Sequence, residues 1–321
     1  MTRGAAIRRG LLVTLASPPT WPLALATFLI RGGIILVLVP IVVVPTPVGI
    51  GTSLGPVLTA LALGQVPVAA VVGAAGIGLV VILWLFGGGW LAAALEGEGA
   101  RMVAADDDVA HEPPRPRAGA ILAARLVAGI PLLLAIVWGS FRLVLTTYRE
   151  LTSPRDVETP IVVRVLTATP EVVVLFVVTW MAAEIVGAIA ARRIALTGDR
   201  VSRSLVGAVG GSLRHPVAVL ARFWIPTLVL VLVIVPSIVA TAAAWTATGD
   251  ALADGRDPVR IAVSVVALVA LFGVGLLLAS VVSAWRAAVW TIAETVSQRT
   301  FGASSDRRPG DWRTEGSSAT L

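Results

Sequence analysis

The sequence contains no lysine, asparagine or cysteine, so all 25 of its basic side chains are arginines. Without cysteine the chain can form no disulfide, no thiolate metal site and no cysteine nucleophile. The missing lysine and asparagine are typical of a GC-rich, bacterial genome. Only 14% of the 321 residues are charged, against about 25% in a soluble domain, and 57% are hydrophobic. This shortage of charge predicts an all-α, polytopic transmembrane helical bundle.

Six apolar runs are long enough to cross a bilayer, which takes about 20 helical residues each. They cover, approximately, residues 22–44, 68–95, 118–146, 162–190, 217–244 and 261–289. Taken in pairs they predict a transmembrane domain over residues 1–300, built from three helical hairpins at about 1–97, 118–193 and 202–297. The polar remainder, 301–321, lacks apolar periodicity and is expected to be a disordered cytoplasmic tail.

The arginines are distributed unequally between the two sides of this arrangement. They are concentrated at the N-terminus, in the loops after the second and fourth segments, and around the tail, whereas the first loop carries no charge. Arginine-rich loops stay in the cytoplasm, so both termini are predicted to be cytoplasmic in a plasma or bacterial inner membrane. Arg8 and Arg9 also resemble a twin-arginine export signal, but the spans that follow favour a short interfacial helix.

Short motifs recur in all three hairpins, which predicts an internal repeat. A Trp-X-Ala-Ala tetrad lies late in the second segment of each hairpin, at Trp90, Trp180 and Trp285. An arginine followed by a bend-forming glycine or proline lies early in the first segment, at Arg31, Arg125 and Arg222.

Before the fifth segment, Leu205, Val206, Val209 and Leu213 share one helical face. This pattern is typical of an amphipathic helix lying among anionic lipid headgroups, and the N-terminus carries a weaker version of it.

Two stretches resemble a known membrane domain. They read SLVGAVGGSLRHPVAVLARFWIP over residues 204–226 and WRAAVWTIAE over residues 285–294. The chain resembles the membrane domain that accompanies some bacterial glycerophosphodiester phosphodiesterases, and related uncharacterised six-helix proteins. The catalytic domain that gives that family its name is not in this sequence. The resemblance therefore implies architecture alone and assigns no catalytic residue.

Two loops carry motifs with a possible chemistry. GTSLG, at 51–55, matches the G-x-S-x-G of serine hydrolases, but prolines precede it, and both histidines are predicted on the opposite side of the membrane from Ser53. A turn is therefore the favoured interpretation. The stretch AADDDVAHEPPRP, at 104–116, holds carboxylates and His111 that suit a divalent cation. A hydrated, proline-rich loop is favoured instead, so no metal or cofactor is predicted.

Ionisable residues inside spans are more informative, because each costs about 2.5–3.5 kcal/mol at the bilayer centre. Glu184 lies inside the fourth apolar run and is expected to pair with Arg31, Arg125 or Arg222. Glu171, near the outer end of that run, is expected to pair with Arg164. These six residues are the candidate substrate or ion-pair residues, and a structural ion pair is favoured over a coupling site.

Three functions remain open on these grounds. The leading hypothesis is a non-enzymatic protein that organises the membrane or binds membrane-protein partners, because no nucleotide loop, metal cluster or catalytic triad is present. The alternative is a small transporter or permease that uses Glu184 and the intramembrane arginines. A lipid-modifying enzyme is third. The arginines form no continuous stripe, so nucleic acid is not an expected partner.

Overall fold

The computed structural model describes residues 5–40, 56, 59–60, 63–106, 117–153, 156, 159–255 and 257–305. Within these residues every regular element is a helix, and six helices are long and apolar enough to cross a membrane. The prediction of an all-α bundle with about six spans is confirmed. The helices are α1 (Ala5–Ala16), α2 (Thr20–Phe28), η1 (Leu29–Gly33), α3 (Ile34–Leu38), α5 (Val68–Leu83), η2 (Trp84–Gly88), α6 (Gly89–Asp106), α7 (Ala118–Thr152), α8 (Ile161–Ala168), α9 (Pro170–Thr197), α10 (Val201–Arg214), α11 (Pro216–Asp254) and α12 (Pro258–Ser305).

The spans differ from the predicted ones mainly at their ends. Spans two, five and six continue well beyond the apolar runs, to Asp106, Asp254 and Ser297. The fourth is shorter at its start, because the backbone leaves the helical region at Thr169 and residues 161–168 form the separate helix α8. Helix α12 continues into the segment assigned to the tail. The GTSLG motif, most of the acidic loop and residues 306–321 lie outside the described residues.

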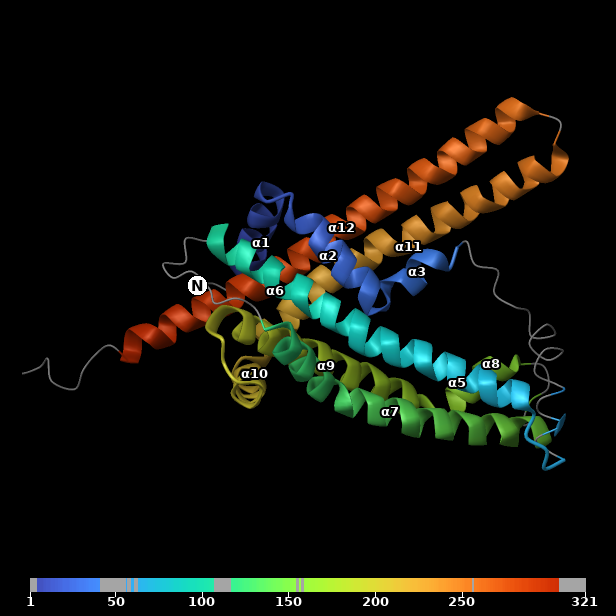
Figure 1. Cartoon of the computed structure of the whole chain (residues 1–321), viewed down its shortest axis with the longest axis horizontal. Helices are drawn as coiled ribbons and strands as arrows, with labels where there is room; N and C mark the ends of the chain where they lie inside the picture. The colour runs from blue at the N-terminus through green and yellow to red at the C-terminus, as the bar shows by residue number, and fades with distance from the viewer. Residues whose placement is uncertain are drawn as a thin grey trace, which may run out of the picture.

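Figure 1 shows the helices converging at one end and separating into two arms at the other. We call the convergent end the base; it carries α1, α10 and the first turns of α7 and α11. One arm consists of α11 and α12, and the other of α5, α6, α7 and α9. Helix α2 lies where the arms meet and packs against both α6 and α12. The opposite ends of the arms are called the tips.

Most buried side chains lie near the base, where the helices converge. The core clusters join α6, α7, α9 and α10, and also α9, α11 and α12, near the base. The buried residues of α12 begin at Ala279, whereas Val263, Val266 and Val269 nearer the tip are each more than 60% exposed. Large apolar side chains that no other described part of the chain covers are what a lipid-facing surface requires.

The helices α1 and α10 lie against the base with their small residues inward. Ala6 and Gly10 of α1 are buried against α12, and the indole Nε1 of Trp285 donates a hydrogen bond to the carbonyl of Ile7 at 3.0 Å. Ser204 and Ala208 of α10 are buried, whereas Val206 and Leu213 are 73% and 76% exposed. Of the predicted apolar face of α10, Val206, Val209 and Leu213 point away from the bundle, whereas Leu205 packs against the core. Placement of this face in the membrane interface stays a prediction.

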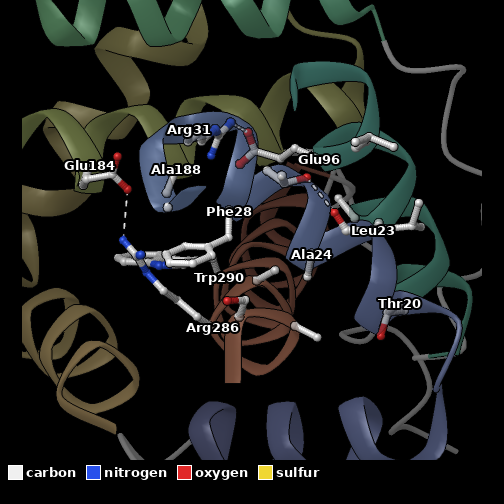
Figure 2. Close-up of a pocket in the computed structure, with 18 of the residues that line it drawn as sticks. Thr20, Leu23, Ala24, Phe28, Arg31, Glu96, Glu184, Ala188, Arg286 and Trp290 are labelled. Carbon is white, nitrogen blue, oxygen red and sulfur yellow. Dashed lines mark hydrogen bonds and ion pairs between the residues drawn. The ribbon is translucent and has the colours of Figure 1, made fainter. Parts of the chain in front are cut away.

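The first span contains a sharp kink. Gly32 has φ of 105°, a conformation that L side chains rarely adopt, and it separates α2 from α3. The expected bends at Pro131 and Pro226 do not interrupt their helices, since α7 and α11 are continuous through both prolines. Arg31 lies at this kink, contacts Glu96 of α6 (Figure 2), and keeps 30% of its side chain exposed.

Candidate functional site

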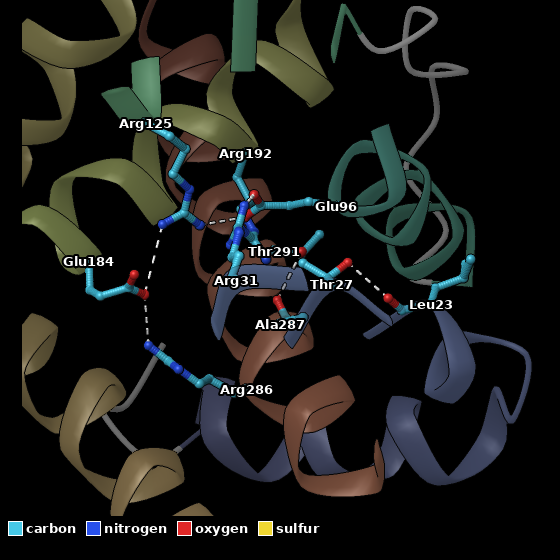
Figure 3. Close-up of polar contacts among 10 residues, drawn as sticks. All are labelled: Leu23, Thr27, Arg31, Glu96, Arg125, Glu184, Arg192, Arg286, Ala287 and Thr291. Atoms are coloured by element: carbon cyan, nitrogen blue, oxygen red, sulfur yellow. Dashed lines mark hydrogen bonds and ion pairs between the residues drawn. The ribbon is translucent and has the colours of Figure 1, made fainter. Parts of the chain in front are cut away.

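Glu96 of α6 lies at the centre of a buried polar cluster. Its side chain is only 3% exposed and forms ion pairs with three arginines. Nη2 of Arg125 on α7 lies 2.6 Å from Oε1 of Glu96, and the guanidiniums of Arg31 and Arg192 contact the same carboxylate. These side chains come from α6, η1, α7 and α9 and converge as Figure 3 shows. Arginine suits this role because its planar fork can donate several hydrogen bonds at once.

Glu184 of α9 is the second carboxylate of the cluster. Its Oε2 accepts a hydrogen bond from Nη2 of Arg286 on α12 at 2.9 Å and lies 3.8 Å from Nη1 of Arg125. Arg125 therefore connects the two carboxylates (Figure 3). At 1.5 Å per residue, Glu184 lies about 20 Å from either end of α9, well inside the length of a span.

Small residues make room for these long side chains. A β-carbon at Gly187 would lie 3.0 Å from Cδ and 3.1 Å from Nη1 of Arg125, so glycine leaves the space that the guanidinium fills. Alanines 93, 188, 190 and 191 are buried where α6 and α9 meet their neighbours, which lets the backbones approach closely. On α12, the guanidinium of Arg286 lies 5.8 Å from the ring centroid of Phe223, within cation–π range.

Arginines outnumber carboxylates in this cluster. Four arginines (Arg31, Arg125, Arg192 and Arg286) accompany two glutamates, which leaves a formal charge of +2. Arg192 is 5% exposed, and its Nε has no hydrogen-bond partner among the described residues; the same is true of Nε of Arg125 and the hydroxyl of Ser283. Buried donors without partners are rare and costly, at about 1–3 kcal/mol each.

These groups line a cavity of about 370 Å³ at the junction of the arms (Figure 2). All six ionisable members of the cluster border it, together with the hydroxyl-bearing Thr20, Thr27 and Ser283. Apolar side chains complete the wall, including Phe28, Leu36, Trp180 and Trp290. Its volume falls within the range of about 300–1,000 Å³ that is common for small-molecule sites.

Three of the six predicted residues meet in this cluster. Glu184 pairs with Arg125 as expected, but Arg31 pairs with Glu96 rather than with Glu184. Arg222 neither pairs with Glu184 nor borders the cavity. Its neighbourhood is instead that of Glu294, which pairs with Arg193 at 2.8 Å.

The expected pair between Glu171 and Arg164 is not formed. Glu171 pairs with Arg142 of α7 at 3.1 Å, and Arg164 pairs with Glu150 at 3.4 Å. On one continuous helix, Glu171 and Arg164 would be two turns apart on the same face. The break at Thr169 removes that relation, so each side chain finds its partner on α7. Both pairs lie towards the tips, away from the central cavity.

Sequence reasoning missed Glu96, Arg192 and Arg286. All three lie just beyond an apolar run or near its end, where charged residues were assigned to the cytoplasmic boundary. A signal was present in the Trp-X-Ala-Ala repeat, because Arg286 is the second residue of the tetrad at Trp285, and Glu96 follows Trp90 by six residues on α6.

The motifs with other possible chemistry fall elsewhere. Ser53, Asp107, Asp108, His111 and Glu112 lie outside the described residues. His215 precedes α11 at the base and does not border the cavity. Among the residues that the structure describes, no group of three or more His, Asp or Glu side chains is placed to hold a metal ion.

Comparison with protein-family models, with curated proteins and with solved structures finds no significant match to this chain. The resemblance to the membrane domain that accompanies some phosphodiesterases therefore stays a prediction. The charged cavity is therefore the feature of this chain that bears most directly on its function.

Proposed function

We propose that this chain is a transporter or permease of the bacterial plasma membrane and that the cavity at the junction of the arms is its anion-binding site. The observation that carries the proposal is the convergence of six ionisable side chains, from η1, α6, α7, α9 and α12, on one cavity. Ionisable residues within spans are costly and commonly mark a substrate or ion pathway.

The shape of the bundle supports transport rather than simple anchoring. The charges lie where the helices converge, and the arms separate towards the tips (Figure 1). A site at the vertex of two arms can be exposed to one side and then the other if the arms rock against each other. Gly32, where the first span kinks, borders the cavity. A change in the backbone dihedral angles at this glycine could accommodate such a movement.

In this proposal the base faces the cytoplasm and the tips face outwards. The arginines of α1, of α10 and of the loops at the base support this orientation. Reporter fusions at Thr52 and Asp107 test it, with the first expected outside and the second inside. The same orientation at both positions would contradict the hairpin topology.

A non-enzymatic protein that binds membrane partners is the second candidate. It is favoured by the apolar faces of α5, α11 and α12 towards the tips, which no other described part of the chain covers. Lipid covers such faces equally well, so this observation is weaker than the charged cavity. A purely scaffolding protein has no need for a surplus of positive charge around a partly buried cavity.

The test is an anion-flux measurement in liposomes of zwitterionic lipid that contain the purified protein. We expect uptake of at least one member of a panel of inorganic and organic anions above that of empty liposomes. Arg192→Gln should abolish this uptake, because it removes a buried cation of the cavity. Arg142→Gln is the matched control, since that arginine belongs to a half-exposed pair towards the tips. Background flux for the whole panel would overturn the proposal.

A further inference from the structure

We propose that the cavity selects phosphate monoesters, whose dianionic phosphate would lie among Arg125, Arg192 and Ser283. This inference rests on the proposed anion site and names its ligand class. Three properties of the cavity carry it: the size of its charge surplus, the type of donor left unpartnered, and the apolar part of its wall.

The charge surplus favours a ligand with two negative charges. Four guanidiniums face two carboxylates around the cavity, so a dianion makes this partly buried cluster neutral, whereas a single carboxylate or a phosphodiester leaves one positive charge. The difference matters because charge interactions are much less screened inside a bundle than in water. A phosphate monoester carries close to two negative charges at pH 7.

The unpartnered donors favour an oxyanion with several acceptor oxygens. Nε of Arg192, Nε of Arg125 and the hydroxyl of Ser283 are buried without hydrogen-bond partners among the described residues, and all three residues border the same cavity. They come from α9, α7 and α12, so they approach the cavity from different directions. Guanidinium groups bind phosphate oxygens through charge-assisted hydrogen bonds. Such bonds are stronger than hydrogen bonds between neutral groups.

The apolar wall favours a phosphate that is joined to a hydrophobic group. Phe28 and Leu36, from the kinked first span, border the cavity, and Figure 2 shows Phe28 and Trp290 beside Arg286. Beyond the kink, apolar side chains of α3 are exposed, with Ile35 68% and Leu38 41% exposed. A lipid-linked phosphate would place its headgroup on the arginines and its chain along this wall. A soluble phosphate monoester would use the charged part alone.

Binding is measured by titrating the full chain in phosphatidylcholine nanodiscs and following its thermal unfolding midpoint. The ligands are phosphatidic acid and glycerol phosphate as monoesters, phosphatidylglycerol as a diester, and acetate as a single-charge carboxylate. We expect each monoester that binds to do so at least about tenfold more tightly than the diester and the carboxylate. Tight binding of phosphatidic acid alone identifies a lipid source, and binding of glycerol phosphate as well identifies the phosphate itself.

Variants assign the binding to this cavity. Arg192→Gln should weaken monoester binding by about 10- to 100-fold. Arg192→Lys, which keeps the charge but lacks Nε, should give an intermediate loss and serves if the glutamine variant does not fold. Glu184→Gln increases the positive surplus and should tighten monoester binding. Arg142→Gln, towards the tips, should change nothing.

The outcomes separate this inference from the function on which it rests. Equal affinity for monoester and diester, or binding of acetate alone, overturns the selection of phosphate monoesters and leaves an anion site in place. Absence of binding and of flux for every anion overturns both proposals. Monoester binding that survives Arg192→Gln undiminished places the ligand elsewhere and also overturns the inference.

Discussion

Replacing Glu96 by glutamine should strongly destabilise the protein. The side chain is 3% exposed and is the shared partner of Arg31, Arg125 and Arg192. The glutamine is nearly isosteric, so the lost quantity is the negative charge at the centre of three guanidiniums. Removing one partner of a buried ion pair costs about 3–5 kcal/mol, because the remaining charges stay buried without compensation. We expect the free energy of unfolding to fall by at least that amount.

The neighbouring Glu98 supplies a matched control on the same helix. Its side chain is 51% exposed and pairs with Arg101 at 3.2 Å, an exposed pair one helical turn apart. Glu98→Gln should cost no more than about 1 kcal/mol. Reversible unfolding in mixed micelles, followed by circular dichroism, measures both variants. Equal losses of stability for Glu96→Gln and Glu98→Gln would refute the argument that the buried cluster depends on this carboxylate.

Three further tests concern the packing around the cluster, an ion pair towards the tips and the attachment of α1 at the base. Gly187→Ala places a β-carbon 3.0 Å from Cδ of Arg125, so it should cost about 1–3 kcal/mol of stability through overpacking and should also weaken anion binding. Thermal unfolding without added anion and with it separates the two effects. Glu171→Gln and Arg142→Gln, whose side chains are 43% and 44% exposed, should show a coupling below about 1 kcal/mol in a double-mutant cycle. Trp285→Phe removes the 3.0 Å hydrogen bond to α1 and should cost about 1 kcal/mol. Hydrogen exchange should then accelerate in α1 ahead of the other helices, and uniform acceleration would argue against this attachment.

The sequence predicts the membrane spans well because lipid imposes a simple rule on them. A spanning helix needs a long apolar run whatever its partners, so the six runs were visible without knowledge of the packing. Their ends were not visible, because α6, α11 and α12 continue past the apolar residues. At the base, protein contacts rather than lipid stabilise the last turns of α6 and the later part of α12, whereas α11 ends at the tip of its arm (Figure 1). Ala100 and Val103 of α6, for example, are buried there against other helices.

The site was predictable only where a charge is surrounded by apolar sequence. Arg31, Arg125 and Glu184 stood out for that reason, and the structure brings them to one cavity. Glu96 and Arg192 follow apolar runs, where a charged side chain normally reaches water at the interface. Which of these charges turns inwards depends on the positions of the other helices, and the sequence of a single helix does not contain that information.

The surplus of positive charge connects stability with function. A cluster of four arginines and two glutamates, with buried donors left unpartnered, makes the anion-free bundle less stable than a neutral cluster of the same shape would be. An anion that supplies the missing charge stabilises the folded state in proportion to its affinity, because it binds the assembled cavity and not the unfolded chain. At the proposed site it would also bridge α7, α9 and α12, which belong to different arms. The same ligand would therefore favour the arrangement in which the arms are held together at the base, and its release would remove that restraint. In a transporter of this design, occupancy of the cavity and the angle between the arms are coupled through the arginines themselves.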